Sequence, residues 1–424
     1  MNKFGTDGIR GIYGKTLMIQ DACALGAALG RQGKVLIGRD NRPSSPILAR
    51  AVACGVRSVG GTFDAVGVTT TPALYYLLTR SNAECAVMVT ASHNPPEHNG
   101  LKVFTQSGKP SEQRREEIER EMSVVSPAFD PHSPYRENND LSTYKNYLKE
   151  HIGSLHGIKA VLDCAGGAGN VFKGLYREMG AEVSVINARK NGEKINENCG
   201  ALHPEECVRE TLRSGADLGI AVDGDGDRII LVTKSGDILD GDRITYLLAC
   251  RMKARGRLQK NKAAMTVMTN SGILRSLKER GIEVLSTAVG DAALAQAMRK
   301  EGLNLGGEQS GHVILGDYLP TGDGILVGAA LMKSILEEGP LENLPPPRLY
   351  PQVLINLPVP DKSVINDPDV TFVAEEVRAS LSEGRILLRA SGTESLVRIM
   401  AEHPDARRAE RAAETLRKEI LLRL

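Results

Sequence analysis

The chain contains an internal repeat, and this repeat limits the possible folds more than any other feature of the sequence. Three stretches each open with a short apolar strand that ends in a polar or glycine turn, beginning at Val35, Val161 and Thr266. A helix follows in each, stops at a glycine and gives way to another strand, beginning at Gly60, Gly180 and Gly281. Short β-branched strands alternating with amphipathic helices predict mainly parallel α/β sheets.

Each repeat then delivers a distinctive loop from the end of a further strand. The loops are TASHNP at Thr90–Pro95, DGDGDR at Asp223–Arg228 and GEQSGH at Gly307–His312. Ligands of parallel α/β sheets collect at the carboxyl ends of the strands, so the three loops are expected to meet at one cleft. The last segment lacks this order and carries a fourth loop, RASGTES at Arg389–Ser395, which is expected to close the cleft.

A chain of 424 residues is too long for one compact core, and two proline-containing stretches, 123–140 and 337–360, interrupt its periodic pattern. We therefore expect an α/β protein of four domains around a central active-site cleft. Three are similar α/β/α domains with mixed, mainly parallel sheets, and a smaller α+β domain ends the chain. The expected boundaries are 1–135, 136–240, 241–344 and 345–424.

Charge and composition point to small-molecule partners. The formal net charge is +1, and no long block of like charge suggests binding to nucleic acid or to a membrane surface. The amino terminus lacks the apolar run of a signal peptide, and no stretch approaches the roughly 18 apolar residues of a membrane span, so a cytoplasmic protein is expected. The seven cysteines are scattered without CxxC pairs and are expected to be reduced and structural.

The DGDGDR loop is predicted to bind a divalent metal ion. It follows the apolar run DLGIAV and places Asp223, Asp225 and Asp227 at alternate positions of a glycine-permitted turn, where all three can face one hard cation. An EF-hand is excluded because its sixth and twelfth positions would be Arg228 and Lys234. With only oxygen ligands in the motif, Mg²⁺ is favoured over zinc. A solvated acidic turn is the alternative, but like charges this close repel unless they are neutralised.

Ser92, in TASHNP, is the candidate nucleophile. The loop follows the apolar strand CAVMV, which presents the Ser92 hydroxyl where a strand ends at the expected cleft. Near a metal site this hydroxyl suits a phosphoryl group better than an acyl group, because there is no G-x-S-x-G elbow and His93 is only its neighbour in sequence. Taken alone, the motif would equally suit an Asn-Pro turn with a capping serine.

The other two loops carry groups that suit a phosphosugar. Arg389, Ser391 and Thr393 of RASGTES offer a guanidinium and two hydroxyls on a flexible glycine backbone, a combination that can clamp a phosphate. Glu308 and Ser310 of GEQSGH can form hydrogen bonds with sugar hydroxyls. Each loop by itself would be as compatible with an ordinary turn.

With these four loops in this order, the chain resembles the α-D-phosphohexomutase superfamily over essentially its full length. The resemblance implies that Ser92 is phosphorylated in the active enzyme and that its phosphate helps the three aspartates to bind Mg²⁺. It also implies a sugar 1,6-bisphosphate as intermediate and activator. Glu308 and Ser310 would contact the sugar, and the phosphate would be bound by Arg389, Ser391, Gly392 and Thr393.

The same resemblance gives roles to four further residues. Arg10 and Arg228 match family positions that steady the transferring phosphoryl group. Lys102 matches a lysine proposed as general acid or base, and His93 is a competing candidate for that role.

Within the superfamily the chain is most similar to the phosphoglucosamine mutases, through FGTDGIRG at 4–11, INENCGALHPE at 195–205 and Gln309. This similarity implies a homodimer that interconverts glucosamine 6-phosphate and glucosamine 1-phosphate and so feeds UDP-N-acetylglucosamine synthesis. Phosphoglucomutases and phosphomannomutases share TASHNP and are the alternative, since Ala292 for arginine and Ser395 for proline depart from the glucosamine pattern. A catalytically silent sugar-phosphate-binding protein is a further alternative, but binding alone needs neither nucleophile nor metal ligands.

Overall fold

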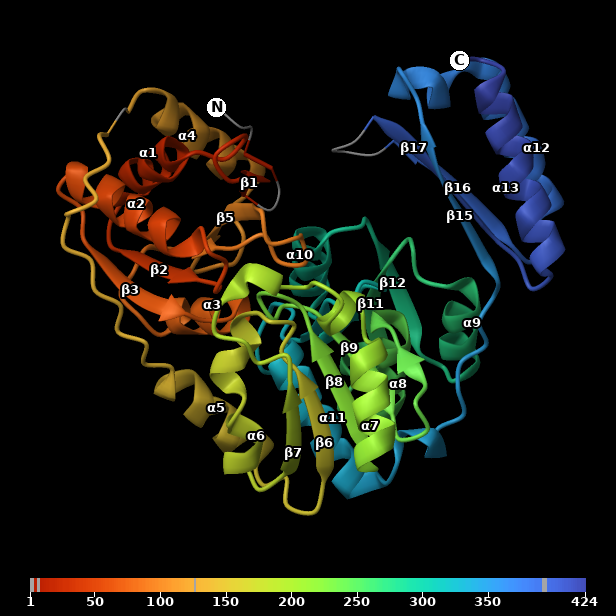
Figure 1. Ribbon diagram of the computed structural model, residues 1–424. Helices are drawn as coiled ribbons and strands as arrows, with labels where there is room; N and C mark the ends of the chain where they lie inside the picture. The colour runs from red at the N-terminus through yellow and green to blue at the C-terminus, as the bar shows by residue number, and fades with distance from the viewer. Residues whose placement is uncertain (1–3, 6–7, 126, 391–394) are drawn as a thin grey trace. The chain divides into compact units, whose positions relative to one another are not determined.

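The computed structural model describes residues 4–5, 8–125, 127–390 and 395–424. The chain forms two compact units, Met1–Val267 with Leu285–Pro345 and Met268–Val284 with Pro346–Leu424. Three α/β sheets build the first unit, and a smaller sheet with helices builds the second (Figure 1).

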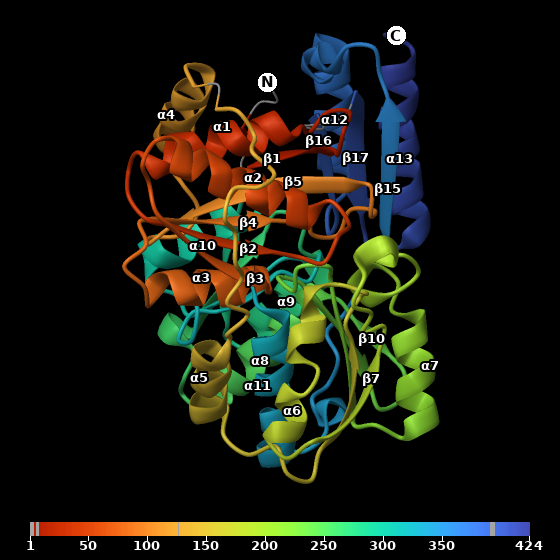
Figure 2. The same ribbon diagram turned by 60° about the vertical axis from the view of Figure 1, so that its left-hand side comes forward.

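The first sheet has five strands. In sheet order they are β1 (Ile9–Ile12), β5 (His98–Thr105), β4 (Cys85–Val89), β2 (Val35–Arg39) and β3 (Phe63–Val68). Its helices are α1 (Ile19–Gly30), α2 (Ser45–Ser58), α3 (Thr71–Thr79) and α4 (Glu112–Ser123). Figures 1 and 2 show α1 and α2 on one face of this sheet and α3 on the other.

The second and third sheets follow along the chain. The second is ordered β10 (Ile238–Leu239), β9 (Ile229–Thr233), β8 (Leu218–Val222), β6 (Lys159–Asp163) and β7 (Glu182–Ile186). The third is ordered β14 (Val313–Leu315), β13 (Leu305–Gly307), β11 (Lys262–Thr266) and β12 (Glu283–Thr287). The remaining helices of this unit are α5 (Ser142–Ile152), α6 (Leu175–Glu178), α7 (Glu205–Ser214), α8 (Gly241–Ala254), α10 (Asp291–Glu301) and α11 (Gly324–Glu338).

The three sheets share one strand order, which confirms the internal repeat and the α/β fold class. In each, the strand before the distinctive loop is β4, β8 or β13. It pairs in parallel with the strand that opens the repeat and antiparallel with the strand that follows the loop. The runs CAVMV and LGIAV of β4 and β8 are buried along their whole length, as expected for central strands. The expected domain boundaries stay a prediction.

One helix differs from the sequence-based expectation. After β6, where a helix was expected, the structure has a 3₁₀ turn at Ala168–Phe172 followed by the four-residue helix α6. Glycine is costly inside a helix, and the segment AGGAG is rich in it. The chain there comes close to another backbone, since a Cβ at Gly167 would lie 2.4 Å from the carbonyl oxygen of Gly224. The glycines therefore serve this close approach at the expense of helix length.

The second unit is built on a three-stranded antiparallel sheet. Its strands are ordered β15 (Gln352–Pro358), β17 (Leu396–Glu402) and β16 (Arg385–Ala390). Helices α12 (Pro368–Ser380) and α13 (Ala406–Leu421) share its apolar core, and α9 (Ser271–Glu279) also belongs to this unit. All seven cysteines are buried, and none of them forms a disulfide. Across the part of the chain that the structure describes, no helix is long and apolar enough to cross a membrane.

Helices α1 and α2 pack backbone against backbone. A Cβ at Gly26 would lie 2.0 Å from the carbonyl oxygen of Val52, and one at Gly55 would lie 1.9 Å from that of Cys23. No side chain fits in so short a gap, so the two helices depend on both glycines.

We predict that Gly55→Ala destabilises the protein by about 1–3 kcal/mol, because the added methyl group must push the helices apart. Helix propensity alone predicts the opposite sign, with alanine more stable by up to about 1 kcal/mol. Urea unfolding followed by circular dichroism measures the change. Gln20→Ala, at an exposed position of α1, is the control and should leave the midpoint almost unchanged. A midpoint that rises in Gly55→Ala would contradict the packing argument.

Candidate active site

Ser92 lies just beyond the end of β4 and contacts the acidic loop of the second sheet. Its Oγ donates a hydrogen bond to Asp223 Oδ2 at 2.6 Å, and the residue is only 1% exposed. Its backbone has φ of +52°, a left-handed conformation that costs free energy for a residue other than glycine. Its N–H donates to Thr90 Oγ1 at 2.9 Å, which helps to hold this conformation. The first two predicted loops therefore meet at the Ser92 hydroxyl.

The three aspartates of DGDGDR are all buried, and one carboxylate oxygen of each lies within 4.8 Å of the others. The Nζ of Lys102, on β5, is 2.7 Å from Asp225 Oδ2 and 3.1 Å from Asp227 Oδ2. Thr71, at the start of α3, donates from Oγ1 to Asp225 Oδ2 at 2.5 Å and from its N–H to the Asp225 carbonyl at 2.9 Å. The cluster is thus contacted by two elements of the first sheet.

The residues present fit a hard divalent cation. Among the described residues, Asp225 Oδ1 and Asp227 Oδ1 are buried without a hydrogen-bond partner. Buried carboxylate oxygens are seldom left unpaired, because the loss of hydration is costly. Oxygen ligands from closely spaced carboxylates are what Mg²⁺ takes in proteins. Asp223, Asp225 and Asp227 are therefore the residues that would hold the ion.

The electrostatics of the cluster follow from burial and neighbouring charge. Burial raises the pKa of Asp223 well above its usual range, and the Asp227 and Asp225 carboxylates raise it further. Burial also acts to raise the pKa of Asp227, but the Lys102 ammonium, with His312 and Arg228, outweighs burial and holds that pKa below its usual value. A dication in the cluster would favour the ionised form of all three carboxyl groups.

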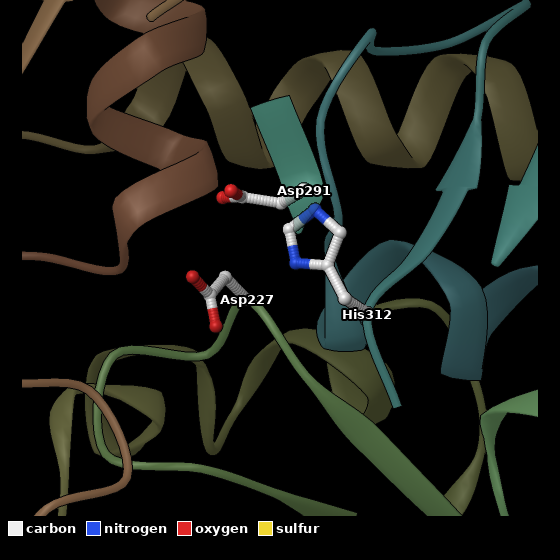
Figure 3. A group of neighbouring side chains, drawn as sticks. All are labelled: Asp227, Asp291 and His312. Carbon is white, nitrogen blue, oxygen red and sulfur yellow. The ribbon is translucent and has the colours of Figure 1, made fainter. Parts of the chain in front are cut away.

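A second group of possible ligands shares Asp227 with the first. Asp227, Asp291 and His312 point toward one another, and their ligand atoms lie within 4.8 Å (Figure 3). The N–H of Gly322 donates to His312 Nε2 at 3.1 Å, so a neutral ring carries its proton on Nδ1 and keeps no free lone pair for a metal ion. Asp291 is also paired with Lys109, whose Nζ is 2.5 Å from Asp291 Oδ2. The DGDGDR aspartates are therefore the better metal candidates.

The third loop adjoins the second in the structure. The N–H of Ile229, next to Arg228, donates to the carbonyl of Gly311 at 2.9 Å. Glu308 is buried and accepts a hydrogen bond from the N–H of Gly290 at 3.3 Å, whereas Ser310 is exposed. Burial raises the pKa of Glu308, although His312 and Arg228 act to lower it. The structure thus brings together the three loops that end the three repeats.

Arg10, His93 and Arg228 lie close enough to influence one another. Arg10 is on β1, opposite Gly100 of β5, and the N–H of Arg228 donates to Asp223 Oδ1 at 3.2 Å. Burial, together with the cations of Arg228 and Arg10, lowers the pKa of His93 to about 4. At neutral pH the His93 imidazole is therefore uncharged.

The fourth loop is described only at its edges. Arg389 lies on β16 of the second unit, opposite Arg398 of β17, and burial together with Arg398 lowers the pKa of its guanidinium. Ser391, Gly392 and Thr393 lie outside the described residues. The phosphate clamp remains a prediction.

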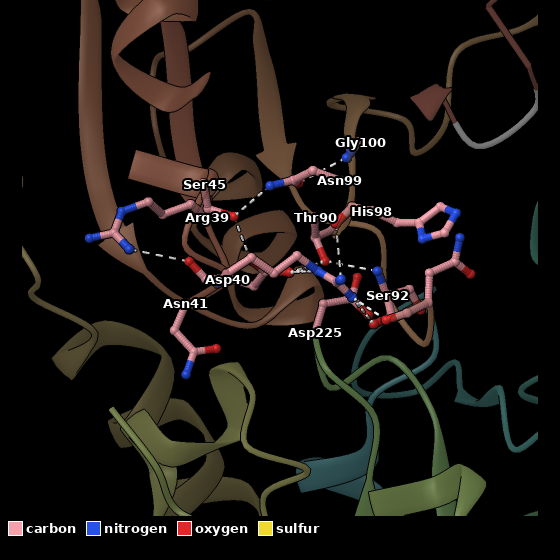
Figure 4. Close-up of polar contacts among 12 residues, drawn as sticks. Arg39, Asp40, Asn41, Ser45, Thr90, Ser92, His98, Asn99, Gly100 and Asp225 are labelled. Atoms are coloured by element: carbon pink, nitrogen blue, oxygen red, sulfur yellow. Dashed lines mark hydrogen bonds and ion pairs between the residues drawn. The ribbon is translucent and has the colours of Figure 1, made fainter. Parts of the chain in front are cut away.

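Four residues that contact these loops were not predicted as site residues. Asp40, Arg42, Thr71 and Asn196 are buried against Ser92, its loop or Asp225 (Figure 4 shows Asp40 and Ser92). The signal was partly visible, since the strings GRDNRP and INENCG contain three of them. These strings by themselves do not distinguish a residue that supports the site from a residue of a solvated turn.

Comparison with known proteins agrees with this arrangement. Family models match in order: phosphoglucomutase/phosphomannomutase α/β/α domains I, II and III over residues 1–127, 142–236 and 240–345, and the C-terminal domain over residues 354–419. A phosphoglucosamine mutase of Caldicellulosiruptor bescii is 41% identical over 99% of each chain, and one of Brevibacillus brevis is 40% identical over 96% of each.

Solved structures show the same fold. A phosphoglucomutase/phosphomannomutase family protein of Burkholderia thailandensis superposes with a TM-score of 0.80 at 24% identity, over 97% of this chain and 95% of that one. An N-acetylphosphoglucosamine mutase of Aspergillus fumigatus, in complex with GlcNAc-6P and magnesium, has a TM-score of 0.69 at 18% identity, over 98% and 95%. With four matching domains and relatives about 40% identical along nearly the whole chain, this protein belongs to the phosphoglucomutase/phosphomannomutase family of isomerases.

Proposed function

We propose that the chain is a phosphoglucosamine mutase. It interconverts glucosamine 6-phosphate and glucosamine 1-phosphate through a phosphorylated Ser92 and a sugar 1,6-bisphosphate. The observation that carries the proposal is the 2.6 Å hydrogen bond from Ser92 Oγ to Asp223 Oδ2, which supports a role for this hydroxyl beside three carboxylates that could hold a cation. The names of the full-length relatives support glucosamine as the sugar.

The reaction balances as two phosphoryl transfers. In the first transfer the Oγ–P bond of phosphoserine 92 breaks and a new O–P bond forms at the free sugar hydroxyl, which loses its proton while Ser92 Oγ gains one, and the bisphosphate forms. After the sugar turns end for end, its other O–P bond breaks and that phosphoryl group bonds to Ser92 Oγ, which loses its proton while the released sugar oxygen gains one. Glu308 and Ser310 would bind the sugar in both orientations, and the loop at Arg389 would hold the phosphate that does not react.

Lys102 and His93 are the candidate groups for proton transfer. The ammonium of Lys102, which contacts Asp225 and Asp227, would donate a proton, and the uncharged His93 imidazole would accept one. Arg10 and Arg228 would steady the charge of the transferring group. Mg²⁺, held by the three aspartates and the phosphoserine, supplies charge neutralisation when bound.

We expect Ser92→Ala to lose mutase activity by more than about three orders of magnitude, because no other group replaces the acceptor oxygen. A coupled assay with glucosamine 1,6-bisphosphate present measures the loss. Intact mass before and after phosphatase treatment should show one phosphate on the parent chain and none on the variant. Ser123→Ala, an exposed serine at the end of α4, is the control. Activity retained in Ser92→Ala would remove the phosphoserine mechanism.

We expect Asp225→Asn to weaken Mg²⁺ binding by at least about tenfold, because one of three ligand charges is lost while the shape is kept. Calorimetric titration of the dephosphorylated protein with MgCl₂ measures this without an activity assay. Asp291→Asn, in the neighbouring group that His312 disfavours as a metal site, should change the affinity far less. Equal affinities for parent and Asp225→Asn would reject the ligand assignment.

The phosphoglucomutase or phosphomannomutase alternative rests on Ala292. At this position a cationic side chain is absent, and Lys109, from the segment after β5, is paired with Asp291, with its Nζ 2.5 Å from Asp291 Oδ2. Sugar selectivity could shift with such a change of geometry, because lysine and arginine bind differently.

Mutase rates on glucosamine, glucose and mannose 1-phosphates decide between a phosphoglucosamine mutase and a phosphoglucomutase or phosphomannomutase. We expect kcat/KM to be highest for glucosamine 1-phosphate, and the order should invert if the alternative holds. We also propose that the protein is a homodimer and that it acts in the cytoplasm.

A further inference from the structure

We propose that Arg42 and Asn196 are positioning residues for phosphoryl transfer: together they clamp the backbone of the Ser92 loop from two different sheets. The proposal rests on the proposed mutase function, in which one seryl oxygen must serve both transfers from the same place. Neither residue was assigned a role by the sequence.

The Arg42 guanidinium is completely buried and binds the loop through its carbonyl groups. Nη2 donates to the carbonyl oxygens of Ser92 at 2.9 Å and Asn94 at 2.8 Å. Nη1 donates to the carbonyl of His98 at 3.0 Å and also to that of Pro95. One side chain thus binds four carbonyl groups, three in the segment that joins β4 to β5 and one at the start of β5.

Asp40 holds this guanidinium and the other end of the loop. Its Oδ2 accepts from Arg42 Nε at 2.9 Å and from Thr90 Oγ1 at 2.7 Å (Figure 4 shows Asp40, Thr90 and Ser92). Its Oδ1 accepts from Ser45 Oγ at 2.6 Å. Since Thr90 Oγ1 in turn accepts the N–H of Ser92, the network is continuous from α2 to the nucleophile.

All five N–H donors of Arg42 are therefore engaged, one by Asp40 and four by carbonyl groups. None remains for a phosphate, and the positive charge is already paired with a buried carboxylate. These contacts argue against a substrate-binding role for Arg42. They favour a role exerted on the backbone of the loop.

Asn196 binds the same loop from the side of the second sheet. Its Nδ2 donates to the carbonyl of Ser92 at 2.8 Å and to that of Asn94 at 3.1 Å, the two groups that Arg42 Nη2 also binds. Asn196 is itself fixed, because its N–H donates to the carbonyl of Ala165 at 2.9 Å. The Ser92 carbonyl therefore accepts from both sides of the boundary between the first and second sheets.

The clamp explains how Ser92 keeps a left-handed backbone. Such a conformation persists only where surrounding contacts determine it, and here the carbonyl group of Ser92 is bound by two side chains and its N–H by a third. A loosened backbone would move Oγ away from Asp223. Loss of alignment between a nucleophile and its acceptor lowers the transfer rate more than it lowers substrate binding.

Asn196→Gly tests the clamp, because glycine tolerates the φ of +60° at this position and removes only the two hydrogen bonds. We expect kcat to fall by roughly 10- to 100-fold, since displacements of about 1 Å cost this much. KM for the sugar phosphate should stay within about threefold, because no substrate contact is removed. Parent and variant are compared with Mg²⁺ and the bisphosphate at saturation.

Asn41→Ala is the matched control. Asn41 is 8% exposed against 6% for Asn196, and its Nδ2 likewise crosses to the second sheet, where it donates to the carbonyls of Gly166 at 2.8 Å and Arg189 at 3.2 Å. It does not bind the Ser92 loop through these contacts, so its removal should lower stability while kcat stays close to that of the parent chain. Equal losses of kcat in Asn196→Gly and Asn41→Ala would show a structural role only and would overturn the proposal.

Arg42→Lys provides an independent variant. Lysine keeps the charge and can keep the pair with Asp40, but it cannot reach four carbonyl groups with three donors, so kcat should fall while the fold is retained. A parent chain without mutase activity would overturn both the function and this proposal. An active parent with unchanged kcat in both Asn196→Gly and Arg42→Lys would overturn the clamp alone.

Discussion

The placement of three carboxylates inside the protein is the constraint on which the rest of the site depends. Asp223, Asp225 and Asp227 are buried side by side, an arrangement that is unfavourable unless positive charge compensates it. The structure supplies Lys102 and Arg228, and two carboxylate oxygens still face no partner among the described residues. A cation from outside the chain would compensate the remaining charge, and a phosphorylated Ser92 would add negative charge that strengthens this requirement.

The repeated topology explains how residues far apart in sequence reach this point. Each repeat places one loop at the end of a central strand, and short backbone contacts fix the loops against one another. Gly226 accepts from the N–H of Gly324 at 3.0 Å, and Thr71 donates to the carbonyl of Asp225. A buried strand end can present only a few side chains, so the three ends together supply Ser92, the three aspartates and Glu308.

Much of this arrangement was predictable. The apolar runs before TASHNP and DGDGDR marked central strands, and alternate acids after a strand marked the buried carboxylate cluster, because both signals are local in sequence. Arg42 and Asn196 escaped prediction for a physical reason, since their partners are carbonyl groups, which every residue carries and no side-chain pattern reveals. The helix after β6 was expected, but the sequence did not indicate that it would be only four residues long, because Gly167 makes a contact with Gly224 that only the folded chain shows. The tip of the RASGTES loop, at 391–394, lies outside the described residues, so it is still known from sequence alone.

The pairing of Arg42 with Asp40 separates two effects that a buried arginine commonly has together: it stiffens the backbone of the Ser92 loop, but it adds little positive field at the Ser92 hydroxyl. A guanidinium beside a nucleophile would ordinarily stabilise an attached phosphate and slow its departure. Here the cation is cancelled by its own carboxylate and turned toward main-chain oxygens, so it stiffens the seryl support without trapping the phosphoryl group. A serine that both accepts and releases the same phosphoryl group in each cycle is suited to a rigid support that carries no net charge.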